Sequence, residues 1–365
     1  MNRRLDLTII FPVTALLTLG LVTLSSALSY NPQKFYVQVI WVLCAAAVFL
    51  VITYRSYRFW ENLSIPLYFS TLILLFLVLV IGKKAGGSYR WLDLGFMNLQ
   101  PSELAKVAVI LFIAYRLNQK PTLQDGYKLR DIAPEVVAVV LVMFLIYVEP
   151  DLGTSILIGA VSFITIFSTK INRRQSIALV VVIIVAMPIL WKFVFADYQK
   201  RRIAAVVTML WSDSPDMTRA DRYQTTQSVI AVGAGRVGGK GYRTGTQNIL
   251  RFIPEHHTDF IFSVYAEEFG FIGCLLLLAL YFLLLYRLLS LIPIVRDKFM
   301  ALVVVGTAAL IWLQVVINIS MVTGMLPVVG IPLPFFSYGG SALIAHAILL
   351  GLVHNFSVHS RYRAG

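Results

Sequence analysis

Carboxylates and cations lie at a few places inside otherwise apolar stretches of the sequence. Glu103 and Lys106 are three residues apart in one such stretch, so on a helix they share a face. Asp151 lies between two further apolar stretches, and Glu267 lies within another. Ionisable groups are costly at membrane depth, so each is a candidate functional residue. The chemistry open to them is acid–base catalysis and the binding of a charged substrate.

Asp259 opens an apolar stretch directly after a long polar segment. If a helix begins near this residue, Asp259, Ser263 and Glu267 lie on one face at positions i, i+4 and i+8. Two carboxylates on one face beside a basic segment suit acid–base chemistry on an anionic substrate. A plain N-cap role for Asp259 competes with catalysis, because aspartate is common at helix starts.

Structural roles compete with function at the other candidates as well. Glu103 and Lys106 are equally well explained as a neutralising ion pair. Asp151, followed by small and hydroxyl residues, fits a helix N-cap. Capping alone leaves Glu149 and Asp151 crowded together, which favours a cationic partner or a bound metal.

The elements that must position these residues are membrane helices. The chain has 365 residues, of which 58% are hydrophobic and 13% are charged. Its mean hydropathy is +0.79, whereas globular domains carry about 25% charged residues. The composition excludes a soluble multidomain protein and a disordered chain, and it predicts an all-α, polytopic membrane bundle.

Ten apolar runs approach or exceed the length of a transmembrane helix, which takes about 20 residues. They are residues 5–24, 36–51, 64–81, 102–117, 134–148, 152–168, 177–195, 259–289, 300–322 and 342–358. The sequence therefore predicts one membrane domain over residues 1–365 with about ten helices. The first run is longer than the h-region of a signal peptide, so we interpret it as a retained helix.

Lysine and arginine are unevenly shared between the two sets of short connections. Sixteen lie in one set: Arg3, Arg4, Arg55, Arg58, Arg116, Lys120, Lys128, Arg130, Lys170, Arg173, Arg174, Arg287, Arg296, Lys298, Arg361 and Arg363. Four lie in the other: Lys34, Lys83, Lys84 and Arg90. The positive-inside rule then predicts that both termini face the cytoplasm. The formal net charge of +13 reflects this topology, and we expect no nucleic-acid partner.

A long polar segment, residues 197–258, separates the seventh and eighth predicted helices and lies outside the cytoplasm in this topology. Connections of this length are usually functional or disordered. Apolar residues recur on one helical face over residues 203–210, which predicts an amphipathic helix on the membrane. Residues 233–238 match GxGxxG, but no βαβ unit surrounds them, so we favour a flexible basic backbone over a dinucleotide site.

Five short motifs follow one another along the chain. They are Trp91-Leu92-Asp93-Leu94-Gly95, Gln100-Pro101-Ser102-Glu103-Leu104-Ala105-Lys106, Pro150-Asp151-Leu152-Gly153-Thr154-Ser155, the stretch from Pro254 to Phe262, and Ser337-Tyr338-Gly339-Gly340-Ser341. In order and spacing they resemble the motifs of the shape, elongation, division and sporulation (SEDS) family over nearly the whole chain.

Two further stretches, residues 245–247 and 326–330, resemble the elongation branch of that family, the rod shape-determining RodA branch, and differ from the FtsW division branch. The chain departs from the family pattern at Glu149, where many members have glutamine, and at His256, where arginine is common. Both departures change only the local electrostatics.

The resemblance implies a peptidoglycan glycosyltransferase of the bacterial cytoplasmic membrane. Such an enzyme polymerises lipid II, an undecaprenyl diphosphate-linked disaccharide peptide, on the outer leaflet during cell elongation and rod-shape maintenance. The resemblance also implies a class B penicillin-binding protein as transpeptidase partner within the elongation machinery.

The resemblance also assigns roles to individual residues. The family's essential aspartate corresponds to Asp259, and its conserved polar residues correspond to Glu103, Lys106 and Asp151. We add three candidate supporting residues, which are Trp91, Glu267 and Ser341.

This chemistry agrees with the residues present. Glycosyl transfer from a lipid diphosphate needs a base for the acceptor hydroxyl and cations for the leaving diphosphate. Asp259 is the candidate base. Because the ordinary pKa of aspartate is about 3.9, we expect a raised pKa or an assisting divalent cation, magnesium or manganese.

Two other functions remain open at this stage. About ten helices with buried charges also suit a lipid II flippase, although no inverted repeat is evident and the densest polar cluster is external. A non-catalytic scaffold for the penicillin-binding protein is the other alternative.

Overall fold

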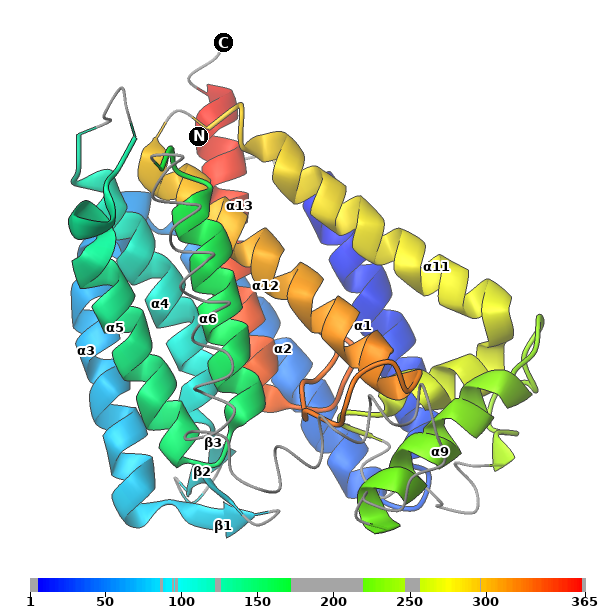
Figure 1. The fold of residues 1–365 in the computed structure, drawn as a ribbon. Coiled ribbons are helices and arrows are strands. Elements are labelled where there is room, and N and C mark those ends of the chain that lie inside the picture. Colours follow the sequence, from blue (N-terminus) through cyan, green and yellow to red (C-terminus); the bar gives the residue numbers. More distant parts are fainter. Residues whose placement is uncertain are drawn as a thin grey trace.

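The computed structural model describes residues 6–85, 88–93, 95, 98–121, 126–171, 219–246, 257–295 and 297–362. In these residues the helices are α1 (Leu7–Ala27), α2 (Pro32–Tyr54), α3 (Tyr57–Ile81), α4 (Pro101–Asn118), α5 (Leu129–Val148), α6 (Leu152–Phe167), α9 (Arg219–Ala234), α11 (Ile261–Leu291), α12 (Lys298–Val322) and α13 (Gly340–Tyr362). Seven of them are long and apolar enough to cross a membrane. The predicted all-α membrane bundle is confirmed (Figure 1).

Nine of the ten predicted runs coincide with a helix. The run at residues 177–195 lies outside the described residues, as does the amphipathic pattern at 203–210. Short polar residues start several of the helices: Asp6 caps α1, Asn31 caps α2 and Asp297 caps α12 through backbone N–H groups in the first turn. Local capping chemistry therefore sets where these three helices begin.

Both chain termini lie at one end of the bundle, and the opposite end carries the β-strands, α9 and the loop of residues 323–339 (Figure 1). The strands are β1 (Lys83–Ala85), β2 (Ser88–Asp93) and β3 (Asn98–Leu99). They form an antiparallel sheet in the order β1-β2-β3. Sequence analysis did not predict this sheet, because strands of two to six residues give little periodic signal.

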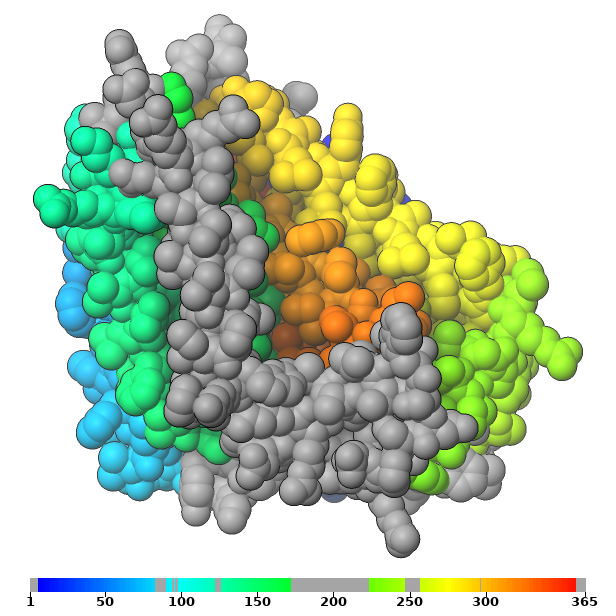
Figure 2. All heavy atoms as spheres, in the orientation of Figure 1, coloured from blue at the N-terminus to red at the C-terminus, as the bar shows by residue number. Residues whose placement is uncertain are grey.

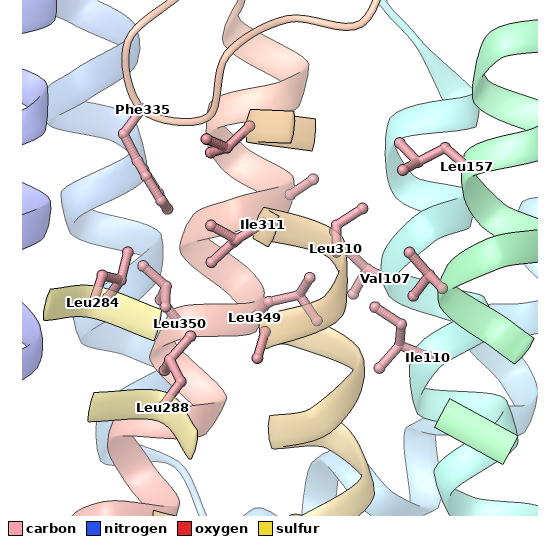
Figure 3. Close-up of a cluster of buried hydrophobic side chains, with 14 of the residues drawn as sticks. Val107, Ile110, Leu157, Leu284, Leu288, Leu310, Ile311, Phe335, Leu349 and Leu350 are labelled. Carbon is pink, nitrogen blue, oxygen red and sulfur yellow. The ribbon is translucent and has the colours of Figure 1, made fainter. Parts of the chain in front are cut away.

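Helix α4 lies at the centre of the bundle, and 13 of its 18 residues are buried. Two of its charged residues, Glu103 and Lys106, are among those buried, and burial among other helices removes such charges from lipid. Helices α3, α5, α6, α12 and α13 pack against it, and Figure 3 shows Val107 and Ile110 close to Leu310 of α12.

The outside of the bundle is apolar, as expected for a surface that faces lipid. On the face drawn in Figure 2, part of α12 lies in a recess beside α11. Trp312 and Val316 of α12 are exposed, as are Phe271, Leu275 and Phe282 of α11. Exposed apolar bulk of this kind is stable in a membrane and not in water.

Helix α11 is bent at Gly270, where φ is 65° and ψ is −164°. The predicted single helix over residues 259–289 is therefore two helical pieces. The backbone groups freed by the bend pair with the glycine-rich segment, residues 235–241. Phe271 N donates to Arg236 O at 2.9 Å, and Lys240 N donates to Glu267 O at 3.0 Å.

The glycines of that segment allow its close approach to α11. A Cβ at Gly235 would lie 1.9 Å from Ala266 O, and a Cβ at Gly239 would lie 2.2 Å from Glu268 O. Neither position has room for a side chain. The interpretation of this segment as a flexible backbone is therefore wrong, because the glycines pack it against the bend of α11.

Candidate functional site

Asp259 lies in the turn of residues 257–260, directly before α11. Phe260 occupies the N-cap position of α11, so Asp259 is not the helix cap that the sequence left open. Asn318 of α12 donates from Nδ2 to the carbonyl oxygens of Asp259 and Ile331, both at 2.8 Å. These two bonds fix the Asp259 turn to the loop of residues 323–339.

The same loop passes beside the carboxylate of Asp259. Gly330 has a φ of +76°, and a Cβ built on it would lie 3.5 Å from Oδ2 of Asp259. The loop residue before Gly330 is Val329, and a Cβ built on Gly153 of α6 would lie 2.7 Å from its carbonyl oxygen. The start of α6 and the Asp259 turn therefore lie against adjacent residues of this loop, Val329 and Gly330. Asp151, two residues before Gly153, lies at this end of the bundle too.

His257 joins the Asp259 turn to two other motifs. Tyr338 N donates to His257 O at 3.0 Å, and the two rings meet edge to face at 5.7 Å. Lys34 Nζ of α2 lies 3.3 Å from His257 Nε2. Gln38, one turn further along α2, accepts from Gly339 N at 3.1 Å. Helix α2 therefore contacts both the Asp259 turn and the start of α13.

Ser341 links the start of α13 to the start of α4. Its Oγ accepts from Gln100 N at 3.2 Å and donates to Asn98 O at 3.4 Å. The motif at residues 100–106 is thereby fixed to the motif at residues 337–341. Trp91 lies in β2, opposite Lys83, at the same end of the bundle (Figure 1).

Glu103 and Lys106 form an ion pair inside the bundle, with Nζ 2.7 Å from Oε1 and both side chains 3% to 4% exposed. Glu103 Oε2 and the neighbouring Ser102 Oγ have no hydrogen-bond partner in the part of the chain that the structure describes. Lys106 and Ser162 line a narrow cleft between α4, α6 and α12 with five apolar side chains. The predicted ion pair is present, and it leaves polar atoms unsatisfied.

A second cluster lies at the junction of α5 and α6. Asp151 caps α6 and accepts from Thr154 N at 3.2 Å and from Thr154 Oγ1 at 3.0 Å. Arg90 of β2 places Nε 3.7 Å from Asp151 Oδ2 and donates to Pro150 O. The cationic partner predicted for the crowded carboxylates is therefore confirmed, and it is Arg90.

Glu149 is fully buried in that cluster. Neither of its carboxylate oxygens has a hydrogen-bond partner among the described residues. Burial and, to a smaller extent, the charge of Asp151 raise the pKa of Glu149 to about 8, against the opposing effect of Arg90. The Glu149 carboxyl is therefore mainly protonated at neutral pH.

The junction at Asp151 and the short loop of residues 90–101 before Glu103 predict that Glu103, Lys106 and Asp151 converge near the external half of the bundle, and this prediction is met in part. All three are buried in the bundle, and none faces lipid. They form two clusters, however, because Lys106 lies level with residues 158–162 of α6. Those residues are roughly 10–16 Å along the helix from Asp151, at 1.5 Å per residue.

Glu267 binds the glycine-rich segment and the residues after it through its carboxylate. Its Oε1 accepts from Lys240 Nζ at 2.6 Å and from the N and Oγ1 of Thr246, both at 2.9 Å. Asp259 precedes α11, so the helical face predicted for Asp259, Ser263 and Glu267 does not extend to Asp259. Ser263 Oγ instead donates to Phe260 O at 2.7 Å.

Three contributors to the site were missed by sequence reasoning. Gln38 and Asn318 are polar residues within apolar runs, and that signal could have found them. Arg90 was counted only as an external charge, and nothing in the sequence pairs it with a residue 61 positions away (151 − 90).

The arrangement offers a half-buried carboxylate, Asp259, with cations at the same end of the bundle, among them Lys34 beside His257 and Arg90 beside Asp151. A carboxylate can take a proton from a hydroxyl, and cations can stabilise a departing anion. Fold and site together define a polytopic helical membrane protein with a polar site at one end of its bundle.

Comparisons with known proteins agree with that class. A family model described as cell cycle protein, which covers FtsW, RodA and SpoVE, matches residues 4–362. The peptidoglycan glycosyltransferase MrdB of Escherichia coli strain K12 is 37% identical over 98% of this chain and 94% of its own length. A probable peptidoglycan glycosyltransferase FtsW of Geobacter sulfurreducens is 36% identical over 97% of this chain and 95% of its own length.

Two solved structures share the fold. One comes from work on how a peptidoglycan synthase complex coordinates polymerization and crosslinking; it has a TM-score of 0.82 at 31% identity and covers 98% of this chain and 99% of that chain. The other is the Thermus thermophilus rod shape-determining protein RodA, with a TM-score of 0.71 at 30% identity, covering 99% and 98% of the two chains. This chain belongs to the FtsW, RodA and SpoVE family, and it is a multi-pass membrane protein.

Proposed function

We propose that this protein is a peptidoglycan glycosyltransferase that polymerises lipid II into glycan strands on the outer leaflet during cell elongation. The observation that carries the proposal is the meeting of the Asp259 turn, the start of α6, the start of α2 and the loop of residues 323–339 at one end of a membrane bundle. The full-length relation to MrdB supports the same reaction.

Asp259 acts as the general base in this proposal. Its carboxylate takes the proton from a sugar hydroxyl of the acceptor, whose oxygen then bonds to the anomeric carbon of the donor. The bond from that carbon to the lipid diphosphate breaks, and the diphosphate leaves with the electron pair. Glu103, Lys106, Asp151, Trp91, Glu267 and Ser341 support the site by holding its helices and loops in place.

A divalent cation, magnesium or manganese, is part of the proposal. In the described part of the chain, no three His, Cys, Asp or Glu residues are grouped as metal ligands. Magnesium commonly uses only one or two carboxylates together with substrate phosphates, so Asp259 with a diphosphate fits that ion. Such an ion neutralises charge on the leaving diphosphate.

The proposal includes location and partner. The protein lies in the bacterial inner membrane with both termini in the cytoplasm, supported by the charge asymmetry and by the common end of the two termini (Figure 1). Residues 197–258 are then extracytoplasmic. A class B penicillin-binding protein supplies transpeptidation within the elongation machinery.

The decisive variant is Asp259→Asn, tested as purified protein in complex with its transpeptidase and fluorescent lipid II. Asparagine keeps the size of the side chain and cannot accept a proton, so we expect polymerisation to fall by about 100-fold to 10,000-fold. Thermal unfolding and recovery of the complex should stay normal. Strand synthesis close to the wild-type rate would end the assignment of Asp259 as base.

Asp297→Asn is the matched control. Asp297 caps α12 at the other end of the bundle, accepting from Phe299 N at 2.8 Å. Asparagine caps nearly as well as aspartate, so this variant carries the same chemical change with little effect on rate. The wild-type experiment also separates the alternatives: leaflet exchange without strands indicates a flippase, and neither result indicates a scaffold.

A further inference from the structure

Three cations of this end of the bundle are already engaged within the chain. Arg90 lies against Asp151, Lys240 binds Glu267, and Arg243 donates to the carbonyl of Ser25 at 3.2 Å. Lys34 differs from them. No carboxylate of the described residues lies within ion-pair distance of its ammonium, and its side-chain contact is with the imidazole of His257, at 3.3 Å.

The hydrogen-bonding capacity of Lys34 is therefore mostly unused. An ammonium carries three N–H donors and no acceptor, so it donates to Nε2 of His257, which is then the unprotonated nitrogen. One donor is used in this way and two remain. The side chain is only half-buried, so these donors can reach a ligand at the surface of the site.

The position of Lys34 on its helix also favours an anion. Helix α2 begins at Pro32, and Lys34 lies in its first turn, which contains no acidic residue. A helix N-terminus carries partial positive charge, so a lysine there adds like charge to like. That arrangement is unfavourable by itself and becomes favourable when an anion binds.

Contacts on both sides fix Lys34 beside the reacting groups. His257 lies two residues before Asp259, and the carbonyl oxygen of His257 accepts a hydrogen bond from Tyr338 N. Gln38 lies on the same face of α2 as Lys34, and its side-chain oxygen accepts a hydrogen bond from Gly339 N at 3.1 Å. These contacts fix the backbone of α2 beside the Asp259 turn, so the Lys34 ammonium can move away only as far as its own side chain allows.

We infer that Lys34 is a substrate-binding residue that holds the diphosphate of the lipid substrate beside Asp259, with His257 orienting its ammonium. This inference rests on the proposed function for the identity of the anion. It assigns to Lys34 a contact with substrate oxygen, and to His257 a positioning role through Lys34.

The test uses the full-length protein in complex with its transpeptidase and compares Lys34→Met, Lys34→Gln and Lys34→Arg. Three quantities are measured: the affinity for undecaprenyl diphosphate, by displacement of a fluorescent analogue, and kcat and KM for lipid II. Removing one charged hydrogen bond should weaken diphosphate affinity and raise KM by about tenfold or more. Lys34→Arg should stay within about threefold of the wild type, since the charge and donors remain.

Three controls make the result specific. Lys128→Met removes an exposed lysine at the opposite end and should change none of the three quantities. Undecaprenyl monophosphate should bind more weakly than the diphosphate to the wild type, and the difference should shrink in Lys34→Met. Added salt should weaken diphosphate binding to the wild type more than to Lys34→Met.

The outcomes separate this inference from the proposed function. If wild-type protein makes no strands but Lys34→Met loses diphosphate affinity, the polymerase proposal fails and the anion site stands. If the wild type polymerises and the Met and Gln variants keep normal KM and diphosphate affinity, the inference about Lys34 is overturned. Loss of the transpeptidase from the complex with unchanged diphosphate binding would also overturn it.

Discussion

The two ends of the bundle differ in how completely their buried carboxyl groups are paired. At the end that carries the termini, Asp6 binds Arg287 at 2.6 Å and also accepts from Thr8 and Ser357. Glu135, fully buried, pairs with Arg116 at 3.2 Å and with Lys120 at 2.7 Å. At the end that carries Asp259, Asp151 and Glu267 are paired with Arg90 and Lys240, but neither carboxylate oxygen of Glu149 has a partner among the described residues.

The pKa values of the two ends differ accordingly. Burial opposes ionisation of Asp6, but hydrogen bonds from Ser357, Thr8 and Arg287 outweigh it and hold the pKa of Asp6 below its ordinary value. Burial of Glu149 is not offset, and its pKa is raised to about 8. A charge that has all its partners within the chain stabilises the fold. A polar group that lacks them is available to a ligand and costs stability.

Among variants that remove a partner of a buried charge, Lys106→Met should have the largest effect on stability. It leaves the Glu103 carboxylate buried and unpaired, which should destabilise the protein by about 3–5 kcal/mol. The double variant Glu103→Gln with Lys106→Met removes both charges and should recover a large part of that loss. Thermal unfolding in detergent measures both. Equal stability of Lys106→Met and wild type would show that Glu103 does not depend on Lys106 as its partner.

Glu149→Gln should stabilise the protein. The pKa of Glu149 is about 8 in the folded state against an ordinary 4.5. Between these two pH values the folded state therefore keeps a proton on Glu149 that the unfolded state has lost. Stability of the wild type therefore falls as pH rises from 4.5 towards 8. Glutamine resembles the protonated carboxyl and removes this dependence, a gain of roughly 3 kcal/mol at pH 7. Unfolding curves of both proteins across that pH range test the prediction; parallel curves would contradict it.

Asp6→Asn should give a smaller loss at the other end, about 2 kcal/mol, because the contact with Arg287 loses its charge while the helix cap remains. Since the folded-state pKa of Asp6 is lowered, its contribution is present above the unfolded pKa and disappears as pH falls. Polymerisation per folded molecule should be unchanged. Reduced activity at equal stability would mean that this end also takes part in catalysis.

Much of this protein is determined by its sequence alone. The hydrophobic runs required a membrane bundle, because each is long enough to cross lipid and too apolar for water. Helices α1, α2 and α12 begin after the local caps Asp6, Asn31 and Asp297, whose chemistry acts within one turn. The Glu103–Lys106 pair followed from helical spacing. All of these are local properties of the chain.

Tertiary structure decided which separate segments meet. Sequence spacing could not pair Arg90 with Asp151, place Lys34 beside His257, or join Asn318 to Asp259, since each contact depends on how helices pack. The bend at Gly270 and the packing of the glycine-rich segment against it were also beyond local reasoning. Periodicity reports which face of a helix is buried, and only packing determines what that face contacts.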